Sequence, residues 1–179
     1  MSSERQREEL AAEKARTMDE IERLQTETVR GEMLRFLTEH RGYAPEDIER
    51  DKEFRVGVAG CEETVSTDFI IKLQDKRFMA IKCAAGAVDS RERHIISLAR
   101  VVDEYQIPYC LVTDGENTRV IDTMRGEIIS EDLYSVLRKE EAVELLQKTK
   151  LSPYPPEKLE REKRILLAFE AVRCPNAKP

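Results

Sequence analysis

The chain has no tryptophan, few aromatic residues, and no apolar run that approaches the length of a membrane span in its 179 residues. A membrane-spanning helix needs about 20 consecutive apolar residues, so the sequence predicts no membrane segment. The N-terminus leads from Ser2 and Ser3 directly into charged residues rather than into an apolar signal region. We therefore expect a cytoplasmic location.

Cysteine and histidine are scarce, and neither is arranged for metal binding. None of the four cysteines forms a CxxC pair, and His40 and His94 fall in different predicted helices. This pattern argues against a zinc site. Cys83 and Cys110 lie in apolar segments, where a reduced thiol packs as a small hydrophobic group, so we expect both to be buried.

Acidic residues outnumber basic ones, 36 to 30, and the net charge is −6. This balance argues against a protein that coats nucleic acid nonspecifically. It leaves DNA chemistry open, because a nuclease gathers acids around its metal. The length and the 40% hydrophobic content suit one domain with appendages.

Residues 3–40 have no proline and predict a long helix. Apolar positions are sparse over 4–27, which is typical of a mobile charged arm or half of a weak coiled coil. From Val29 the apolar stripe strengthens, and this part of the helix should pack against a sheet. Gly42 is suited to a left-handed cap at the helix end.

The middle of the chain alternates strand and helix patterns. We predict strands at 53–58, 65–73, 77–83, 109–113, 118–122 and 127–129, and helices from Asp89 to Tyr105, at 131–149 and at 157–173. Residues 77–83 and 109–113 flank a helix and should be parallel. The predicted fold is therefore a mixed α/β sheet flanked by helices. We expect a charged arm at 1–27, a sheet domain at 28–130 and a helical extension at 131–179.

Asp68 and Lys82 fall opposite each other if residues 74–76 form the loop of a hairpin. That register pairs 73 with 77 and 70 with 80, and it places Asp68, Lys82 and Ala80 on one side of the sheet. A slip of one residue would separate the two charges. On the pattern alone, a simple cross-strand ion pair explains them.

The order of motifs resembles the PD-(D/E)XK nuclease superfamily, and more closely the N-terminal domain of type I restriction enzyme R subunits. The resemblance covers roughly residues 27–130 and rests on several spaced segments. These are Val29 to Leu37, Gly42-Tyr43, Asp68-Phe69-Ile70-Ile71, Met79-Ala80-Ile81-Lys82-Cys83-Ala84 and Cys110-Leu111-Val112-Thr113-Asp114-Gly115.

The resemblance implies a restriction-endonuclease-like fold and a Mg²⁺-dependent DNA cleavage site. In that family an Asp and an acid or amide two residues before the Lys hold the metal, and the Lys positions the attacking water. These roles fall on Asp68 and Lys82, with a helical acid, Glu32 or Glu27, in support. The second ligand position is Ala80, and a methyl group cannot coordinate a hard cation.

Two interpretations of this departure remain open. The metal-binding acid has migrated to the following helix, where Asp89 and Glu92 are the candidates, or the site has decayed into a DNA- or protein-binding module. An N-cap role for Asp89 and a solvated position for Glu92 are the plain alternatives. Mg²⁺ is expected in the first case and no cofactor in the second.

Partner surfaces are suggested by two further features. Arg91, Arg93 and Arg100 form a basic strip that could contact the phosphate backbone of DNA or simply face solvent. The terminal helices could mediate a homodimer or bind a protein. The apolar face of 157–173 needs cover from the sheet or from another chain.

Overall fold

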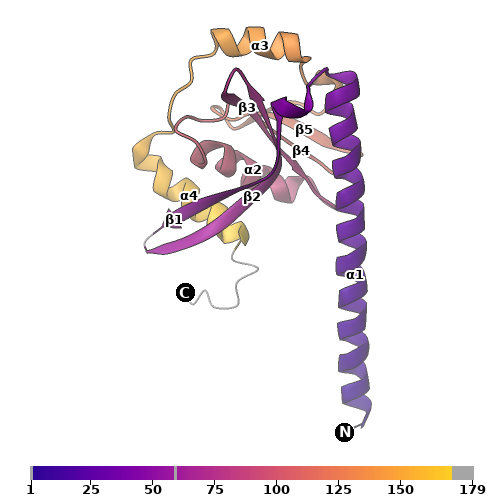
Figure 1. The fold of residues 1–179 in the computed structure, drawn as a ribbon. Coiled ribbons are helices and arrows are strands. Elements are labelled where there is room, and N and C mark those ends of the chain that lie inside the picture. The colour runs from indigo at the N-terminus through magenta and orange to yellow at the C-terminus, as the bar shows by residue number, and fades with distance from the viewer. Residues whose placement is uncertain (1, 59, 171–179) are drawn as a thin grey trace.

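In the computed structural model, which describes residues 2–58 and 60–170, a mixed sheet lies between two helical layers (Figure 1). The helices are α1 (Ser2–Arg35), α2 (Asp89–Val101), α3 (Lys139–Lys148) and α4 (Pro156–Glu170). Short helical turns span Phe36–His40 (η1, a π-helical turn that extends α1), Pro45–Asp47 (η2) and Leu133–Ser135 (η3). No helix among the described residues is long and apolar enough to cross a membrane.

The sheet has six strands in sequence order: β1 (Ile48–Val58), β2 (Cys61–Leu73), β3 (Lys76–Cys83), β4 (Tyr109–Thr113), β5 (Thr118–Asp122) and β6 (Glu127–Ser130). Only β3 and β4 pair in parallel, as predicted, because α2 carries the chain back between them. The predicted α/β class, a mixed sheet with helices on both faces and at both ends of the chain, is confirmed.

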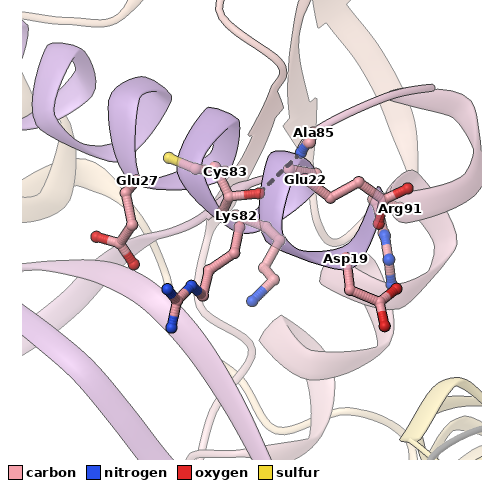
Figure 2. A pocket seen from close by; sticks show the side chains of 10 residues that line it. Asp19, Glu22, Glu27, Lys82, Cys83, Ala85 and Arg91 are labelled. Carbon is pink, nitrogen blue, oxygen red and sulfur yellow. Dashed lines mark hydrogen bonds between the residues drawn. The ribbon is translucent and has the colours of Figure 1, made fainter. Parts of the chain in front are cut away.

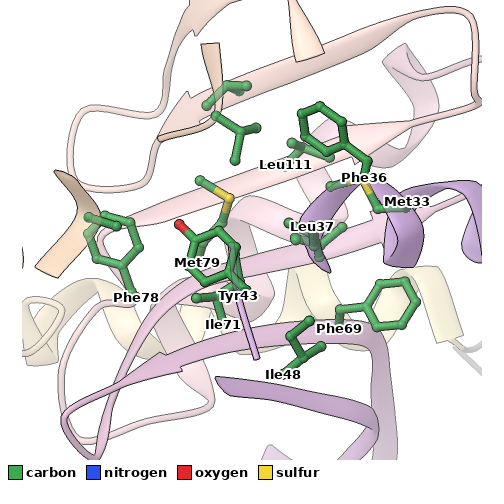
Figure 3. Close-up of a cluster of buried hydrophobic side chains, with 14 of the residues drawn as sticks. Met33, Phe36, Leu37, Tyr43, Ile48, Phe69, Ile71, Phe78, Met79 and Leu111 are labelled. Atoms are coloured by element: carbon green, nitrogen blue, oxygen red, sulfur yellow. The ribbon is translucent and has the colours of Figure 1, made fainter. Parts of the chain in front are cut away.

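Alternation along the strands divides the core in two. Phe69 and Ile71 point to one face, where they pack with Met33 and Leu37 from the end of α1 and its π-helical extension, and with residues of α3 (Figure 3). Ile70 points to the other face, where it joins an apolar cluster that includes residues of α2 and α4. This period of two is the sheet geometry that the sequence pattern predicted.

The β2–β3 hairpin turns more tightly than predicted. Gln74 and Asp75 both have positive φ, 48° and 62°, as a two-residue type I′ turn requires. Leu73 therefore pairs with Lys76, and the predicted pairing of 73 with 77 is wrong. A bulge between Ile71 and Lys72 then restores Ile70 opposite Ala80, so the register near the candidate site is the predicted one.

Other boundaries also differ from the prediction. β1 begins at Ile48 rather than at residue 53. The prediction missed this start because residues 49–53 are all charged and show no apolar alternation. The predicted helix at 131–149 is shorter, and α3 begins only at Lys139. α2 ends at Val101 rather than at Tyr105. Residues 171–173 of the last predicted helix lie outside the described residues.

Candidate functional site

Asp68 is buried beside the end of β3, where it accepts one hydrogen bond and pairs with two side-chain cations. Its side chain is 9% exposed, and Oδ2 accepts a 2.7 Å hydrogen bond from the backbone N–H of Cys83. Lys82 Nζ lies 3.4 Å from the same oxygen. The predicted juxtaposition of Asp68 and Lys82 therefore exists, and the carboxylate is satisfied within the protein.

The third partner of Asp68 is Arg30 of α1, which sequence analysis did not single out. Arg30 Nε lies 3.5 Å from Asp68 Oδ1, and the same guanidinium pairs with Glu27 at 3.2 Å and with Asp51 of β1. Partial burial lowers the pKa of Arg30, but the charges of Asp68 and Asp51 outweigh that effect and raise it. The arginine thus joins α1 to two acids on neighbouring strands.

The signal for Arg30 was present but weak. Arg30 directly follows Val29, where the buried stripe of α1 begins, so a partly buried side chain could be expected there. The Arg30 side chain is 21% exposed in the structure. Glu27 is a local partner on the same helix, but Asp51 and Asp68 come from 21 and 38 residues further along the chain, and no local pattern connects them with Arg30.

Lys82 lines a pocket of about 300 Å³ between α1 and the segment that follows β3 (Figure 2). Three carboxylates on one side of α1, Asp19, Glu22 and Glu27, form the wall of this pocket. Arg91 of α2 lines it as well. Thr26 of α1 contacts the segment that follows β3, because its hydroxyl accepts a 3.2 Å hydrogen bond from Ala85 N–H.

Glu32, the other helical acid considered for the site, does not line this pocket. It lines a neighbouring depression with the β4–β5 turn, which includes Asp114 and Gly115. A Cβ on Gly115 would lie 3.8 Å from a carboxylate oxygen of Glu32. Of the two α1 acids, Glu27 is therefore the one that shares a pocket with Lys82.

Ala80 occupies the position of the second metal ligand and is completely buried. It lies opposite Ile70 and packs in the apolar cluster formed with α2 and α4. The methyl group therefore belongs to the hydrophobic core between the sheet and α2.

Asp89 and Glu92, the candidates for a migrated acid, pair with Arg119 of β5. Glu92 Oε2 lies 2.5 Å from Arg119 Nη1, Asp89 contacts Nη2, and Glu131 Oε1 lies 3.8 Å from Nε. The Glu92 and Asp89 carboxylates raise the pKa of Arg119. The N-cap of α2 is Val88, which makes no side-chain cap. Both acids are thus engaged with an arginine, and neither lines the Lys82 pocket.

A comparison with protein families gives one match, over residues 25–134. The matching description is "Type I restriction enzyme R protein N terminus", and it covers more than half of the chain. The chain belongs to this family. No curated protein and no solved structure gives a match.

The match to the restriction enzyme R protein family begins near the buried end of α1 and includes the whole sheet and α2. Most of α1 and all of α3 and α4 lie outside it. The resemblance stated from the motifs is therefore confirmed at the level of the family.

A magnesium ion does not fit the candidate site of this R-protein-like domain. Mg²⁺ and Mn²⁺ take several oxygen ligands, whereas Asp68 already pairs with Arg30, Lys82 and an amide, and Ala80 supplies no oxygen. Across residues 2–58 and 60–170, no three His, Cys, Asp or Glu side chains are grouped so that they could hold a metal ion.

The three arginines of the predicted basic strip on α2 lie in two different environments in this R-protein-like domain. Arg91 lines the Lys82 pocket, but Arg93 and Arg100 turn towards Glu162 of α4, at 2.7 and 3.3 Å. Arg100 also donates to the carbonyl of Thr123 and is only 10% exposed. Two of the three predicted DNA-contacting arginines are therefore engaged in helix packing.

Glu162 is the second important residue that sequence analysis missed. It accepts hydrogen bonds from Ser97 at 2.9 Å and Tyr154 at 3.1 Å in addition to the arginines. We call Arg93, Ser97, Arg100, Tyr154 and Glu162 the Glu162 cluster. The alternation of acids and bases around residue 162 predicted an exposed, salt-bridged helix. Glu162 is only 4% exposed, but nothing in the neighbouring sequence distinguishes it from the exposed acids of the same helix.

The predicted burial of two thiols is confirmed. Cys83 and Cys110 are free and almost fully covered. Burial raises the pKa of each to about 12, and the nearby Asp68 carboxylate adds to the effect at Cys83. Cys174 lies outside the described residues.

Proposed function

We propose that this domain keeps the fold of the restriction enzyme R protein N terminus but does not cleave DNA, and that it acts as a binding module for a protein partner. Family membership supports a nuclease ancestry for the fold. It does not require that the site still works, because function depends on the site rather than on the fold.

The observation that carries the proposal is the environment of Asp68. A metal-binding carboxylate must offer its lone pairs to the cation, but those of Asp68 face Arg30, Lys82 and the Cys83 amide. The two side-chain cations supply the positive charge that a metal would otherwise bring. Asp68 therefore acts as a structural anion that joins α1, β2 and β3.

The charge around the pocket favours a protein over DNA. Asp19, Glu22 and Glu27 line the pocket together with Arg23, Lys82 and Arg91, so a phosphate approaching the lysine would also meet three carboxylates. A DNA-binding surface instead presents clustered lysine and arginine, and the net charge of this chain is −6. A mixed-charge pocket suits polar contacts with another protein.

Calorimetric titration of Mn²⁺ into wild type and Asp68→Ala, with a plasmid-cleavage assay in Mg²⁺, tests the loss of catalysis. We expect no saturable binding in either protein and no cleavage. Saturable binding in wild type that disappears in Asp68→Ala, together with cleavage, would establish an active enzyme. Asp89→Ala and Glu92→Ala would then identify the acid that leaves Arg119 to complete the site.

The variant Ala80→Glu tests whether the missing ligand at this position alone accounts for the expected lack of metal binding. We expect no metal binding, because the introduced carboxylate would enter an apolar cluster and Asp68 would keep its cationic partners. Circular dichroism must first show that the variant is folded. Gain of Mn²⁺ binding in folded Ala80→Glu would mean that the remaining site is still competent.

Fluorescence anisotropy with a labelled DNA duplex tests the choice of partner. We expect weak binding that does not change in Lys82→Ala or Arg91→Ala. Tight binding that both substitutions abolish would replace the protein partner with DNA.

A further inference from the structure

Arg41, which directly follows the π-helical turn η1, is a buried arginine without an acidic partner. It is 9% exposed, and no carboxylate of residues 2–58 or 60–170 forms an ion pair with it. Its Nη2 donates a 2.8 Å hydrogen bond to the carbonyl of Tyr134, and its enclosed Nε has no hydrogen-bond partner among these residues. The described chain thus gives this guanidinium a backbone acceptor but no counter-charge.

Other largely covered arginines of the domain do have carboxylate partners. Arg77 donates to Glu49 at 2.8 Å, and Arg100 lies 3.3 Å from Glu162. A buried charge without a counter-charge costs folding free energy, and an unpaired buried polar group in a native structure calls for an explanation. The exception at Arg41 therefore needs a reason of its own.

Two aromatic rings hold the Arg41 guanidinium in place. Its Cζ lies 4.8 Å from the centroid of the Phe36 ring and 5.2 Å from that of Tyr134, and the two rings meet edge to face at 5.4 Å. Phe36 is buried, whereas Tyr134 is 66% exposed, the largest fraction among the large hydrophobic residues that the described chain exposes. Cation–π contacts stabilise the guanidinium but bring no net negative charge.

We propose that Arg41 and Tyr134 form a docking point for an aspartate or glutamate side chain of a partner protein. A guanidinium matches the two oxygens of a carboxylate. Arginine and tyrosine are enriched among the few residues that carry most of the binding energy at protein interfaces, and π-helical turns are frequent at functional sites. The partner's carboxylate supplies the counter-charge that the described chain does not provide.

The surroundings of Arg41 favour a carboxylate over the phosphates of DNA. A DNA-binding surface clusters several lysines and arginines, whereas Arg41 follows an exposed acid of η1, Glu39, in a chain of net charge −6. Lys139 donates its backbone N–H to the Arg41 carbonyl, but its ammonium lies 2.6 Å from Asp47. One unpaired cation suits one carboxylate. The inference rests on the proposed function only in naming a protein as the partner.

Nuclear magnetic resonance of the complete ¹⁵N-labelled chain tests the site with sodium acetate as the probe. We expect acetate to shift the Nε–Hε signal of Arg41 saturably, and sodium chloride at the same concentration to leave it in place. Arg77, whose Nε already donates to Glu49, is the internal control, and neither salt should shift its signal. No acetate shift at Arg41, or equal shifts at both arginines, would overturn the proposal.

Inorganic phosphate in the same titration identifies the class of anion. We expect phosphate to bind Arg41 no more tightly than acetate, because a single unpaired cation is present. If phosphate saturates the Arg41 shift at a concentration ten-fold or more below that of acetate, a phosphate-bearing ligand replaces the carboxylate and the proposal is wrong.

Fluorescence anisotropy with a labelled hexaglutamate peptide compares variants of the complete chain. We expect Tyr134→Ala, which removes an exposed ring and keeps the cation, to weaken binding about three-fold. Arg41→Ala should weaken it at least about ten-fold. Arg55→Ala, at a β1 side chain that is 81% exposed, is the matched control and should bind like wild type.

Circular dichroism first shows whether Arg41→Ala is folded, and Tyr134→Ala carries the comparison where it is not. No binding of hexaglutamate by wild type, or an equal loss in Arg55→Ala, would overturn the docking point. Neither metal nor DNA is present in these measurements, so their failure is distinguishable from a failure of the proposed loss of catalysis.

Discussion

At the scale of single residues, Asp68 determines how the candidate site is understood. Acids gathered for a metal repel one another when the metal is absent, so removing one can stabilise the protein at the expense of function. Asp68 has the opposite environment, with an amide and two cations directed at it. The sign of the stability change in a variant therefore separates a structural acid from a catalytic one.

We expect Asp68→Ala to lower the free energy of unfolding by about 2 kcal/mol, because it removes the acceptor of the Cys83 N–H, the carboxylate that pairs with Lys82 and one of the three acids that pair with Arg30. Urea unfolding followed by circular dichroism measures the change. Glu62→Ala, on the same strand and 61% exposed in a 3.8 Å contact with Arg55, should change stability by less than about 0.5 kcal/mol. A stabilised Asp68→Ala would contradict the structural role.

At the scale of elements, α4 depends on one buried carboxylate. Leu166 of α4 is completely buried in the cluster shared with α2 and the strands, so the sheet and α2 cover the apolar face of this helix. Burial alone would raise the pKa of Glu162, but hydrogen bonds from Arg93 and Ser97 and the charges of Arg93 and Arg100 outweigh it and lower the pKa. The Glu162 cluster thus fixes a helix that lies outside the family match.

Glu162→Gln should cost about 2–3 kcal/mol of unfolding free energy, because the Arg100 guanidinium is then left buried without its counter-charge. Urea unfolding monitors the loss. Glu160→Gln, which removes only the 3.8 Å surface contact with Arg164, should cost no more than about 0.5 kcal/mol. Equal effects of the two substitutions would show that the Glu162 cluster does not hold α4.

The Glu162 cluster also predicts a dependence on pH. Because the folded protein lowers the pKa of Glu162, its contribution is fully present above the ordinary glutamate value of 4.5 and is lost as the pH falls below it. The stability difference between wild type and Glu162→Gln should therefore shrink between about pH 6 and pH 3. Urea midpoints measured across this range test it, and a difference that grows in acid would reverse the assigned direction.

At the scale of the whole molecule, the N-terminal half of α1 extends beyond the sheet (Figure 1). Met18, Ile21 and Leu24, near the middle of the helix, are 59%, 44% and 57% exposed. The buried stripe of the helix begins only at Val29. The predicted charged arm at 1–27 corresponds to this exposed part, although its separation as a domain remains a prediction.

Removal of residues 1–18 should leave the free energy of unfolding unchanged within about 0.5 kcal/mol, because none of the side chains that the structure describes in this segment belongs to either apolar cluster. The helical signal in circular dichroism should fall in proportion to the residues lost. Chemical unfolding of the truncated and complete chains makes the comparison. A large loss of stability would show that the arm packs against the body or against another copy.

Prediction from sequence succeeded where the signal was local and periodic. The strands at 109–113 and 118–122 were predicted with their observed limits, since short apolar runs between turn residues define them. The charged start of β1 and the tight turn at Gln74 and Asp75 were missed. The charged residues at the start of this edge strand do not alternate with apolar ones. The residue types Gln74 and Asp75 do not by themselves indicate that both adopt positive φ.

The sequence by itself determined the family, the mixed sheet and the meeting of Asp68 with Lys82, because periodicity and hairpin register are properties of adjacent residues. Only the tertiary structure decided what surrounds them. Arg30 pairs with Asp68 from α1, Arg119 pairs with Asp89 and Glu92, and Glu162 pairs with Arg93 and Arg100. Each of these contacts joins residues far apart in the chain, and the charge of a side chain alone does not select its partner.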